Sequence, residues 1–137
     1  MSFESIVRET FARQKLMSLF GAQLTRISDG EVEITLPFRE DLGQQSGTLH
    51  AGTIAAIADA ACGLAALTKM PAGSDVVSVE FKLNLLAPAI GERFAARARV
   101  IRAGRTLSVV AADVFANDET IVATMLATMM RRAPLSS

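Results

Sequence analysis

The feature that most constrains this chain is a nearly unbroken apolar run at residues 51–68, "AGTIAAIADAACGLAALT", with one acidic residue, Asp59, at its middle. The run is apolar around almost its whole helical circumference, so it predicts a helix that other elements must cover. Its richness in Ala and Gly, together with the central charge, favours a buried helix of a soluble protein over a membrane span. A buried carboxylate without a partner is costly, so Asp59 calls for a functional explanation.

The overall charge excludes several classes of partner. The 137 residues carry 14 Lys and Arg against 14 Asp and Glu, and they contain no Trp or Tyr. No global field therefore attracts the chain to nucleic acid or to an anionic membrane, and no aromatic platform for stacking bases is available. The single cysteine, Cys62, and a charged N-terminal stretch that does not resemble a signal peptide predict a cytoplasmic protein.

Periodicity outlines the remaining elements. Apolar side chains within residues 1–19 recur at helical spacing, which predicts one amphipathic helix. The Asp29-Gly30 pair predicts a tight hairpin turn between strands at 22–28 and 31–36. Four longer strand-like runs follow the central helix, at 76–86, 92–102, 106–116 and 120–130, with turns predicted at Ala103-Gly104 and Asn117-Asp118. We therefore expect one α+β domain over residues 1–137, whose core at 20–132 is an antiparallel sheet curled around the central helix. The last strands are apolar on both faces, which predicts a second subunit against the outer face.

Four motifs together carry a family resemblance. They are "GTLHAG", which leads into "IADAACGLAAL", and the later segments "VEFKLNLLAPA" and "AGRTLSV". Over roughly residues 20 to 132 the chain resembles the hotdog-fold acyl-CoA thioesterases, in particular the phenylacetate-pathway and hydroxybenzoyl-CoA thioesterase branch. The resemblance implies a hotdog fold, hydrolysis of acyl-CoA thioesters, and no cofactor beyond the coenzyme A of the substrate.

The resemblance also implies four catalytic positions. Asp59 would act as nucleophile or as general base on water, and the backbone N–H of Ala51 would polarise the thioester carbonyl. Gln44 matches an Asn or Gln that positions substrate or water, and Ser78 matches a hydroxyl that assists the attacking water in one branch. Many members have His-Gly-Gly where this chain has His-Ala-Gly. Alanine keeps its N–H, but its methyl group restricts how closely a carbonyl can dock.

Substrate contacts are expected from five further residues. His50 and Gly52 flank the helix start, and Arg105 with Thr106 forms a turn whose counterparts in relatives contact coenzyme A phosphates. Gly63, one helical turn after Asp59, leaves space that would suit an acyl chain or, equally, a second helix. No Gly-rich phosphate loop is present, and no second cysteine or histidine accompanies Cys62, so we expect no metal site.

Helix geometry predicts where the reaction takes place. At ~1.5 Å rise per residue, Asp59 lies about 12 Å along the axis from Ala51. One thioester carbonyl must lie within about 3–3.5 Å of both the attacking group and the oxyanion donor. One helix cannot supply both groups, but two antiparallel helices related by a two-fold axis can. We therefore expect intersubunit sites in a homodimer. Separately, we expect two such dimers to associate as a homotetramer.

Each of these assignments has a structural alternative. Asp59 could lie on a solvent-exposed face of the helix, or it could be paired to another buried polar group. His50 could order the loop through backbone hydrogen bonds, and Cys62 could be a core residue. Gln45 competes with Gln44 for the same role. Ser78 falls on the polar face of its strand by strict alternation, and if that face turns away from the helix the assignment of Ser78 fails.

Two other functions fit the same sequence. An enoyl-CoA hydratase or dehydratase on this fold would pair a histidine with an acid, and His50 is available for that role. A non-catalytic acyl-CoA-binding module would bind the substrate without releasing thiol. The position of His50 directly at the helix start, in a His-x-Gly pattern, favours the thioesterase over the hydratase.

Overall fold

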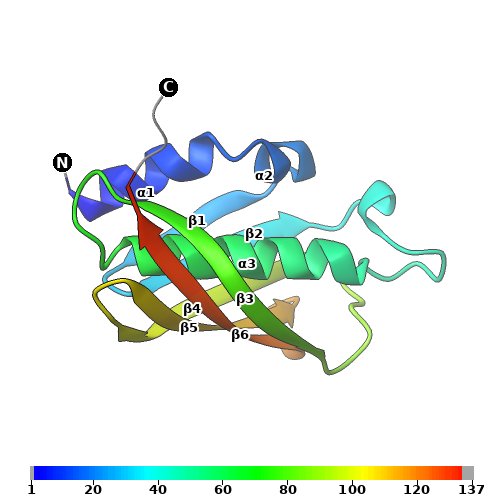
Figure 1. The fold of residues 1–137 in the computed structure, drawn as a ribbon. Helices are drawn as coiled ribbons and strands as arrows, with labels where there is room; N and C mark the ends of the chain where they lie inside the picture. The colour runs from blue at the N-terminus through cyan, green and yellow to red at the C-terminus, as the bar shows by residue number, and fades with distance from the viewer. Residues whose placement is uncertain (1, 134–137) are drawn as a thin grey trace.

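The computed structural model describes residues 2–133, which form a six-stranded antiparallel sheet wrapped around the long helix α3 (Figure 1). The strand order is β1-β2-β4-β5-β6-β3, so β1 and β3 are the edges. The elements in chain order are α1 (Phe3–Ala12), α2 (Lys15–Phe20), β1 (Gln23–Ser28), β2 (Glu31–Pro37), the 3-10 helix η1 (Glu40–Leu42), α3 (Ala51–Leu67), β3 (Asp75–Leu85), β4 (Arg93–Ala103), β5 (Leu107–Ala116) and β6 (Thr120–Arg132). This architecture confirms the predicted α+β class and the predicted central helix.

The core lies between α3 and the concave face of the sheet. Fully buried side chains from the helix, such as Ile57 and Leu64, pack against strand residues that include Ile34 and Phe94. The strands curl because each has a right-handed twist, and the curl covers most of the helix circumference. One stripe of α3 stays half-open, and Asp59 lies on it. The charge is therefore placed at the edge of the core and not inside it.

The predicted turns follow from residues that tolerate left-handed backbone. Gly30 closes the β1–β2 hairpin at φ 81°, while Asn117 and Asp118 close the β5–β6 hairpin at φ 51° and 59°. Both central residues of the second turn have positive φ, which is the conformation of a type I′ hairpin turn. These turns fix the register of the strands, and with it the position of every side chain near α3.

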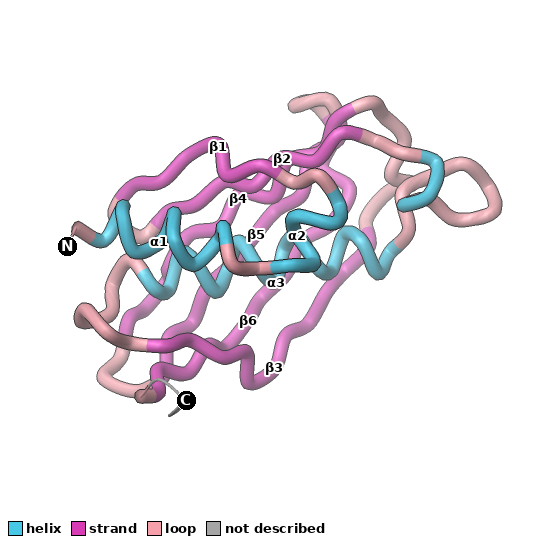
Figure 2. Tube along the Cα trace, turned by 90° about the horizontal axis from the view of Figure 1, so that it is seen from above, coloured by secondary structure: helices cyan, strands magenta, loops and turns pink. Residues whose placement is uncertain are grey.

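The N-terminal region differs from the expected single helix. Helix α1 ends at Ala12, and Gln14 adopts an extended conformation (φ −80°, ψ 99°) before α2 begins at Lys15. The break lets the chain turn while both helices keep apolar side chains on the protein, with Val7 and Met17 buried. Figures 1 and 2 show the two helices on the opposite side of α3 from β4 and β5.

Strand β3 does not alternate strictly, contrary to the sequence prediction. Ser78 pairs with Met129 and Glu80 pairs with the adjacent Thr128, so Val79 is an extra residue in a β-bulge. A bulge shifts the side-chain alternation by one position. Ser78, expected on the polar outer face, is thereby turned inward beside Met129, while Val79 is 53% exposed. The physical reason is the pairing with β6, which local sequence does not reveal.

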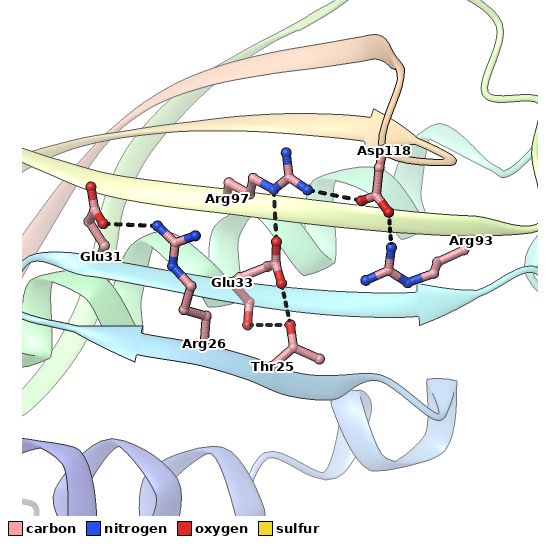
Figure 3. Close-up of polar contacts among 7 residues, drawn as sticks. All are labelled: Thr25, Arg26, Glu31, Glu33, Arg93, Arg97 and Asp118. Carbon is pink, nitrogen blue, oxygen red and sulfur yellow. Dashed lines mark hydrogen bonds and ion pairs between the residues drawn. The ribbon is translucent and has the colours of Figure 1, made fainter.

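Ion pairs cover the outer face of the sheet at β1, β2 and β4. Glu33 accepts hydrogen bonds from Arg97 Nε at 2.7 Å and Thr25 Oγ1 at 2.7 Å, and Arg97 also pairs with Asp118 (Figure 3). The Arg97 guanidinium lies 4.8 Å from the centre of the Phe115 ring. Arg26, Arg93 and Arg97 of these strands therefore each pair with an acidic side chain.

Candidate active site

The predicted catalytic residues lie in two separate clusters, each called a half-site below, and Asp59 with Ser78 forms the centre of the first. The Ser78 hydroxyl donates to Asp59 Oδ1 at 2.6 Å, and its oxygen lies 3.4 Å from Met129 Sδ. Asp59 is half-buried and makes no ion pair among residues 2–133. The carboxylate is therefore held by a neutral hydroxyl, and Asp59 Oδ2 makes no hydrogen bond within this part of the chain. The inward turn of Ser78 at the bulge makes this contact geometrically accessible.

A cavity of about 390 Å³ lies beside this pair. Its walls come from α2, from the half-open stripe of α3, and from β3 and β6. The lining residues are Gln14, Lys15, Leu16, Met17, Ala56, Asp59, Ala60, Gly63, Val76, Ser78 and Met129. Asp59, Ser78 and Gly63 are site residues predicted from the sequence, whereas Leu16 and Met17 were not predicted. The sequence feature that could have identified them is that Leu16 and Met17 are adjacent apolar residues in an N-terminal segment to which no functional role was assigned.

The start of α3 has one free backbone donor. His50 caps the helix because its Nδ1 accepts the Gly52 N–H at 2.7 Å, and its carbonyl oxygen accepts the N–H groups of Thr53 and Ile54 at 3.0 and 3.1 Å. Within residues 2–133, the Ala51 N–H makes no hydrogen bond. The cap therefore satisfies the neighbouring donors and leaves the Ala51 amide, at the positive end of the helix dipole, available to an anion or a polarised oxygen.

A second cavity, of about 600 Å³, opens at this helix start. It is lined by Ala51, His50 and Gln44, with the apolar segment 85–89 opposite. The Gln44 N–H donates to the Thr48 carbonyl at 2.9 Å, and its side-chain amide donates to the Thr48 hydroxyl. These bonds order the loop and direct Gln44 to the cavity. Gln45 does not line it, so the geometry favours Gln44 over its neighbour.

The two cavities have no lining residue in common. Asp59, Ser78 and Gly63 lie in one, while Gln44, Ala51 and His50 lie in the other. Within one protomer the structure therefore does not bring the carboxylate to the free amide. This separation agrees with the distance along α3 deduced from helix rise.

Arg105 and Thr106 lie outside both cavities. They form the β4–β5 turn, which Figure 1 shows near the C-terminal end of α3, away from the helix start. The turn is tight because the Gly104 N–H donates to the Leu107 carbonyl at 2.9 Å, and a Cβ at Gly104 would come within 2.5 Å of that oxygen. The Thr106 carbonyl accepts the Arg131 N–H at 2.8 Å, which ties the turn to β6.

Cys62 is a core residue and not a second nucleophile. Burial, together with the nearby negative charge of Asp59, raises the pKa of the thiol to about 12. A thiol at that pKa stays protonated at neutral pH, and the thiolate is the reactive form. Within residues 2–133, no cluster of three or more His, Cys, Asp or Glu side chains could hold a metal ion. No helix in the described part of the chain is long and apolar enough to cross a bilayer.

Comparisons with known proteins place the chain in a family. The thioesterase superfamily profile matches residues 46–123, which include α3 and most of the sheet. The solved structure of a thioesterase family protein from Silicibacter pomeroyi is 43% identical, with a TM-score of 0.94 over 97% of this chain and 100% of that chain. The E. coli PaaI protein from the phenylacetic acid degradation operon shares the fold, with 15% identity and a TM-score of 0.87 over 98% of this chain and 96% of that chain.

A sequence relative agrees with this placement. A protein of Halobacterium salinarum, provisionally named an esterase, is 33% identical over 99 residues, which are 69% of this chain and 65% of that protein. The family profile covers more than half of the chain, and the half-sites described above lie within or against the matched segment. This chain therefore belongs to the thioesterase superfamily and has its hotdog fold.

Proposed function

We propose that this protein hydrolyses acyl-CoA thioesters to a free acid and coenzyme A, at sites formed between two copies of the chain. The observation that carries the proposal is the separation of two complementary half-sites on one protomer. One half offers a carboxylate held by a hydroxyl, at Asp59 and Ser78, and the other offers a free helix-start amide at Ala51 with Gln44 beside it. A two-fold axis that sets two α3 helices antiparallel joins each half to its complement.

The chemistry needs both halves on one thioester. The Ala51 N–H and the helix dipole of one copy stabilise the carbonyl oxygen as it becomes an oxyanion. As a base, Asp59 of the other copy takes a proton from water while the water oxygen bonds to the acyl carbon. The C–S bond then breaks, and the coenzyme A thiolate takes up a proton. As a nucleophile, Asp59 bonds to the acyl carbon first, the C–S bond breaks, and the coenzyme A thiolate leaves and takes up a proton. Water then hydrolyses the resulting anhydride to the free acid and the Asp59 carboxylate.

An isotope experiment separates these two routes. In a single turnover in H₂¹⁸O, hydrolysis of an Asp59 anhydride at its aspartyl carbon leaves ¹⁸O in the protein, whereas direct attack by water sends all of the label to the acid. Mass spectrometry of the peptide that contains Asp59 reads the outcome. Label found in the peptide establishes the anhydride route, because direct attack by water on the thioester never transfers ¹⁸O to Asp59.

The free edge of β3 supports the dimer. Among residues 2–133, this strand pairs with β6 and has no partner on its other side. Its exposed large side chains are Val79, Phe81 and Leu85, at 53%, 42% and 54% exposure. An unpaired edge with apolar side chains is a surface that another strand can cover. On the outer face, Leu107 and Leu126 are also about half exposed, at 50% and 52%. These residues support the further step to a tetramer, which native mass spectrometry tests.

Ala51→Pro tests the oxyanion role with little change to the fold. Proline is favoured at the first position of a helix and lacks only the N–H that is otherwise free there. His50 has φ −65° and ψ 140°, which is the conformation that a residue before proline prefers. We expect kcat to fall by about 100-fold or more, with an unchanged circular dichroism spectrum. Thiol release from acyl-CoA, followed with a thiol reagent, measures the loss.

Mixed dimers test whether the sites lie between subunits. When Asp59→Asn and Ala51→Pro chains with different tags are co-expressed and purified as heterodimers, one of the two sites combines both intact halves. We expect about half of the wild-type rate, although each variant alone is nearly inactive. Inactive heterodimers would place both groups in one chain and contradict the proposal.

Hydration of an enoyl-CoA without thiol release would instead indicate a hydratase, and tight binding without either reaction would indicate a binding module.

A further inference from the structure

The cavity beside Asp59 extends along α3 as a groove. Ala56, Asp59, Ala60 and Gly63 line it at positions i, i+3, i+4 and i+7, so they follow one another on a single helix face. The groove continues from Asp59 to Gly63 over one turn, about 6 Å along the axis. Helix α2 forms one wall, and β3 with β6 forms the other (Figures 1 and 2).

Gly63 is the unusual residue in this groove. It lies inside a regular 17-residue helix, where glycine is destabilising relative to alanine. Its φ is not in the left-handed region, and a Cβ built on it would meet Val76 Cγ1 at 3.9 Å, which is ordinary van der Waals contact. Neither the backbone nor the packing of this protomer therefore requires a glycine. What the missing side chain provides is space beside Asp59.

The walls around that space are mainly apolar. The larger apolar side chains that line it are those of Leu16, Met17, Val76 and Met129. Met17 and Met129 are almost completely buried, at 2% and 0% exposure, so these two side chains belong to the core beneath the groove. Methionine adapts its shape readily, so these walls fit an apolar group of irregular outline. The polar members, Gln14 and Lys15, come from the start of α2.

We propose that this groove binds the acyl group of the substrate and that Gly63 sets the size of acyl group the enzyme accepts. The inference rests on the proposed function, because it places the acyl carbon next to Asp59. An acyl group attached to that carbon passes along the Gly63 surface between α2 and β3. The preferred substrates are apolar acyl-CoAs of aryl or medium-chain size, and an acetyl group is too short to reach Gly63.

Gly63→Leu tests the groove by filling it, with acetyl-CoA, hexanoyl-CoA and benzoyl-CoA as probes. We expect kcat/KM for hexanoyl-CoA and benzoyl-CoA to fall about 10-fold or more, while the value for acetyl-CoA changes less than about 3-fold. Gly63→Ala should lower kcat/KM for hexanoyl-CoA and benzoyl-CoA by a smaller factor than Gly63→Leu, and it should raise the thermal unfolding midpoint by about 2–5 °C. Ala12→Leu adds similar apolar bulk at an exposed helix position outside the groove and serves as the control.

A rescue variant separates lost space from disturbed catalysis. Val76 faces the position that a Gly63 side chain would occupy, so Val76→Ala combined with Gly63→Ala should restore the rates with the two larger substrates. An equal loss on all three probes, or no loss on any, would overturn the inference. Dissociation of the oligomer by Gly63→Leu, measured by light scattering, would also overturn it, because Gly63 would then be a contact between helices.

Binding measurements keep the inference separate from the proposed reaction. In the Asp59→Asn background, calorimetric titration should show tighter binding of benzoyl-CoA than of acetyl-CoA, and Gly63→Leu should remove the difference. That result would support the acyl groove even if no probe released thiol from the wild-type protein. If the Asp59→Asn protein that retains Gly63 bound benzoyl-CoA and acetyl-CoA with equal affinity, the acyl-groove inference would be overturned, whatever the rate of hydrolysis.

Discussion

Glu33 and Asp59 are two of the carboxylates that accept a hydrogen bond from a hydroxyl, and their surroundings differ. On the outer face, Glu33 accepts from Thr25 at 2.7 Å and is also bound by Arg97 at 2.7 Å. Beside α3, Asp59 accepts from Ser78 at 2.6 Å and has no cationic partner among residues 2–133. The hydroxyl is common to both pairs, so the difference between them is the guanidinium.

That difference separates a structural carboxylate from a chemically available one. Burial alone would raise the pKa of Glu33, but hydrogen bonds from Thr25 and Arg97 and the positive charges of Arg97 and Arg93 outweigh it and lower the pKa. A carboxylate stabilised in this way is a weak base and has no free oxygen to offer. Asp59 is held, among residues 2–133, by one neutral donor at the side of a cavity, and under the proposed function it is this carboxylate that meets the substrate.

Removing the charge from each carboxylate should give the largest contrast. Asp59→Asn should lower kcat/KM by about 100- to 10,000-fold, because it removes the proposed nucleophile or base while keeping the side-chain size. Glu33→Gln, the matched control, should leave the rate within about 2-fold of wild type. Assays of thiol release with one acyl-CoA measure both. An Asp59→Asn enzyme with wild-type turnover would end the assignment of Asp59.

Removing the hydroxyl partner of Asp59 should lower kcat more than removing the hydroxyl partner of Glu33, but the difference should be smaller than for the carboxylates themselves. Ser78→Ala frees Asp59 from its orienting hydrogen bond, and we expect kcat to fall about 10-fold, equivalent to ~1.4 kcal/mol, with little change in KM. Thr25→Ala removes the corresponding hydroxyl at Glu33 and should leave kcat unchanged. Because Ser78→Thr retains a hydroxyl, it should recover part of the lost rate. Equal effects of Ser78→Ala and Thr25→Ala would show that Ser78 acts on stability alone.

Local pattern predicted most of the fold. The central helix at Ala51–Leu67, the Asp29-Gly30 hairpin and the β5–β6 turn at Asn117 and Asp118 all follow from periodicity or from residues with special backbone freedom. The position of Asp59 on α3 and the free Ala51 amide follow from helix geometry in the same way. These features depend on residues that are close in sequence, which is where pattern analysis is informative.

The features that were missed depend on distant partners. The bulge at Val79 arises from pairing with β6, and it reverses the predicted direction of Ser78. The break between α1 and α2 lets Leu16 and Met17 line the Asp59 cavity, some 40 residues from Asp59 in sequence. Strict alternation and helical spacing describe a strand or helix in isolation. They therefore cannot predict a residue whose orientation is set by another element.

The smallest expected effect is the pH dependence that Glu33 gives to stability. Its pKa in the folded protein is lowered from an ordinary value of 4.5, so its contribution is fully present above that pH. The contribution is lost as the pH falls through the folded-state pKa, because the unfolded chain then binds the proton more readily than the folded one. At pH 7, Glu33→Gln should lower the free energy of unfolding by about 1–2 kcal/mol. Urea unfolding of both proteins should show this difference shrinking below pH 4.5. A difference that is constant from pH 7 to pH 3 would mean that Glu33 stabilises the sheet through packing and not through its charge, and the distinction from Asp59 would then rest on position alone.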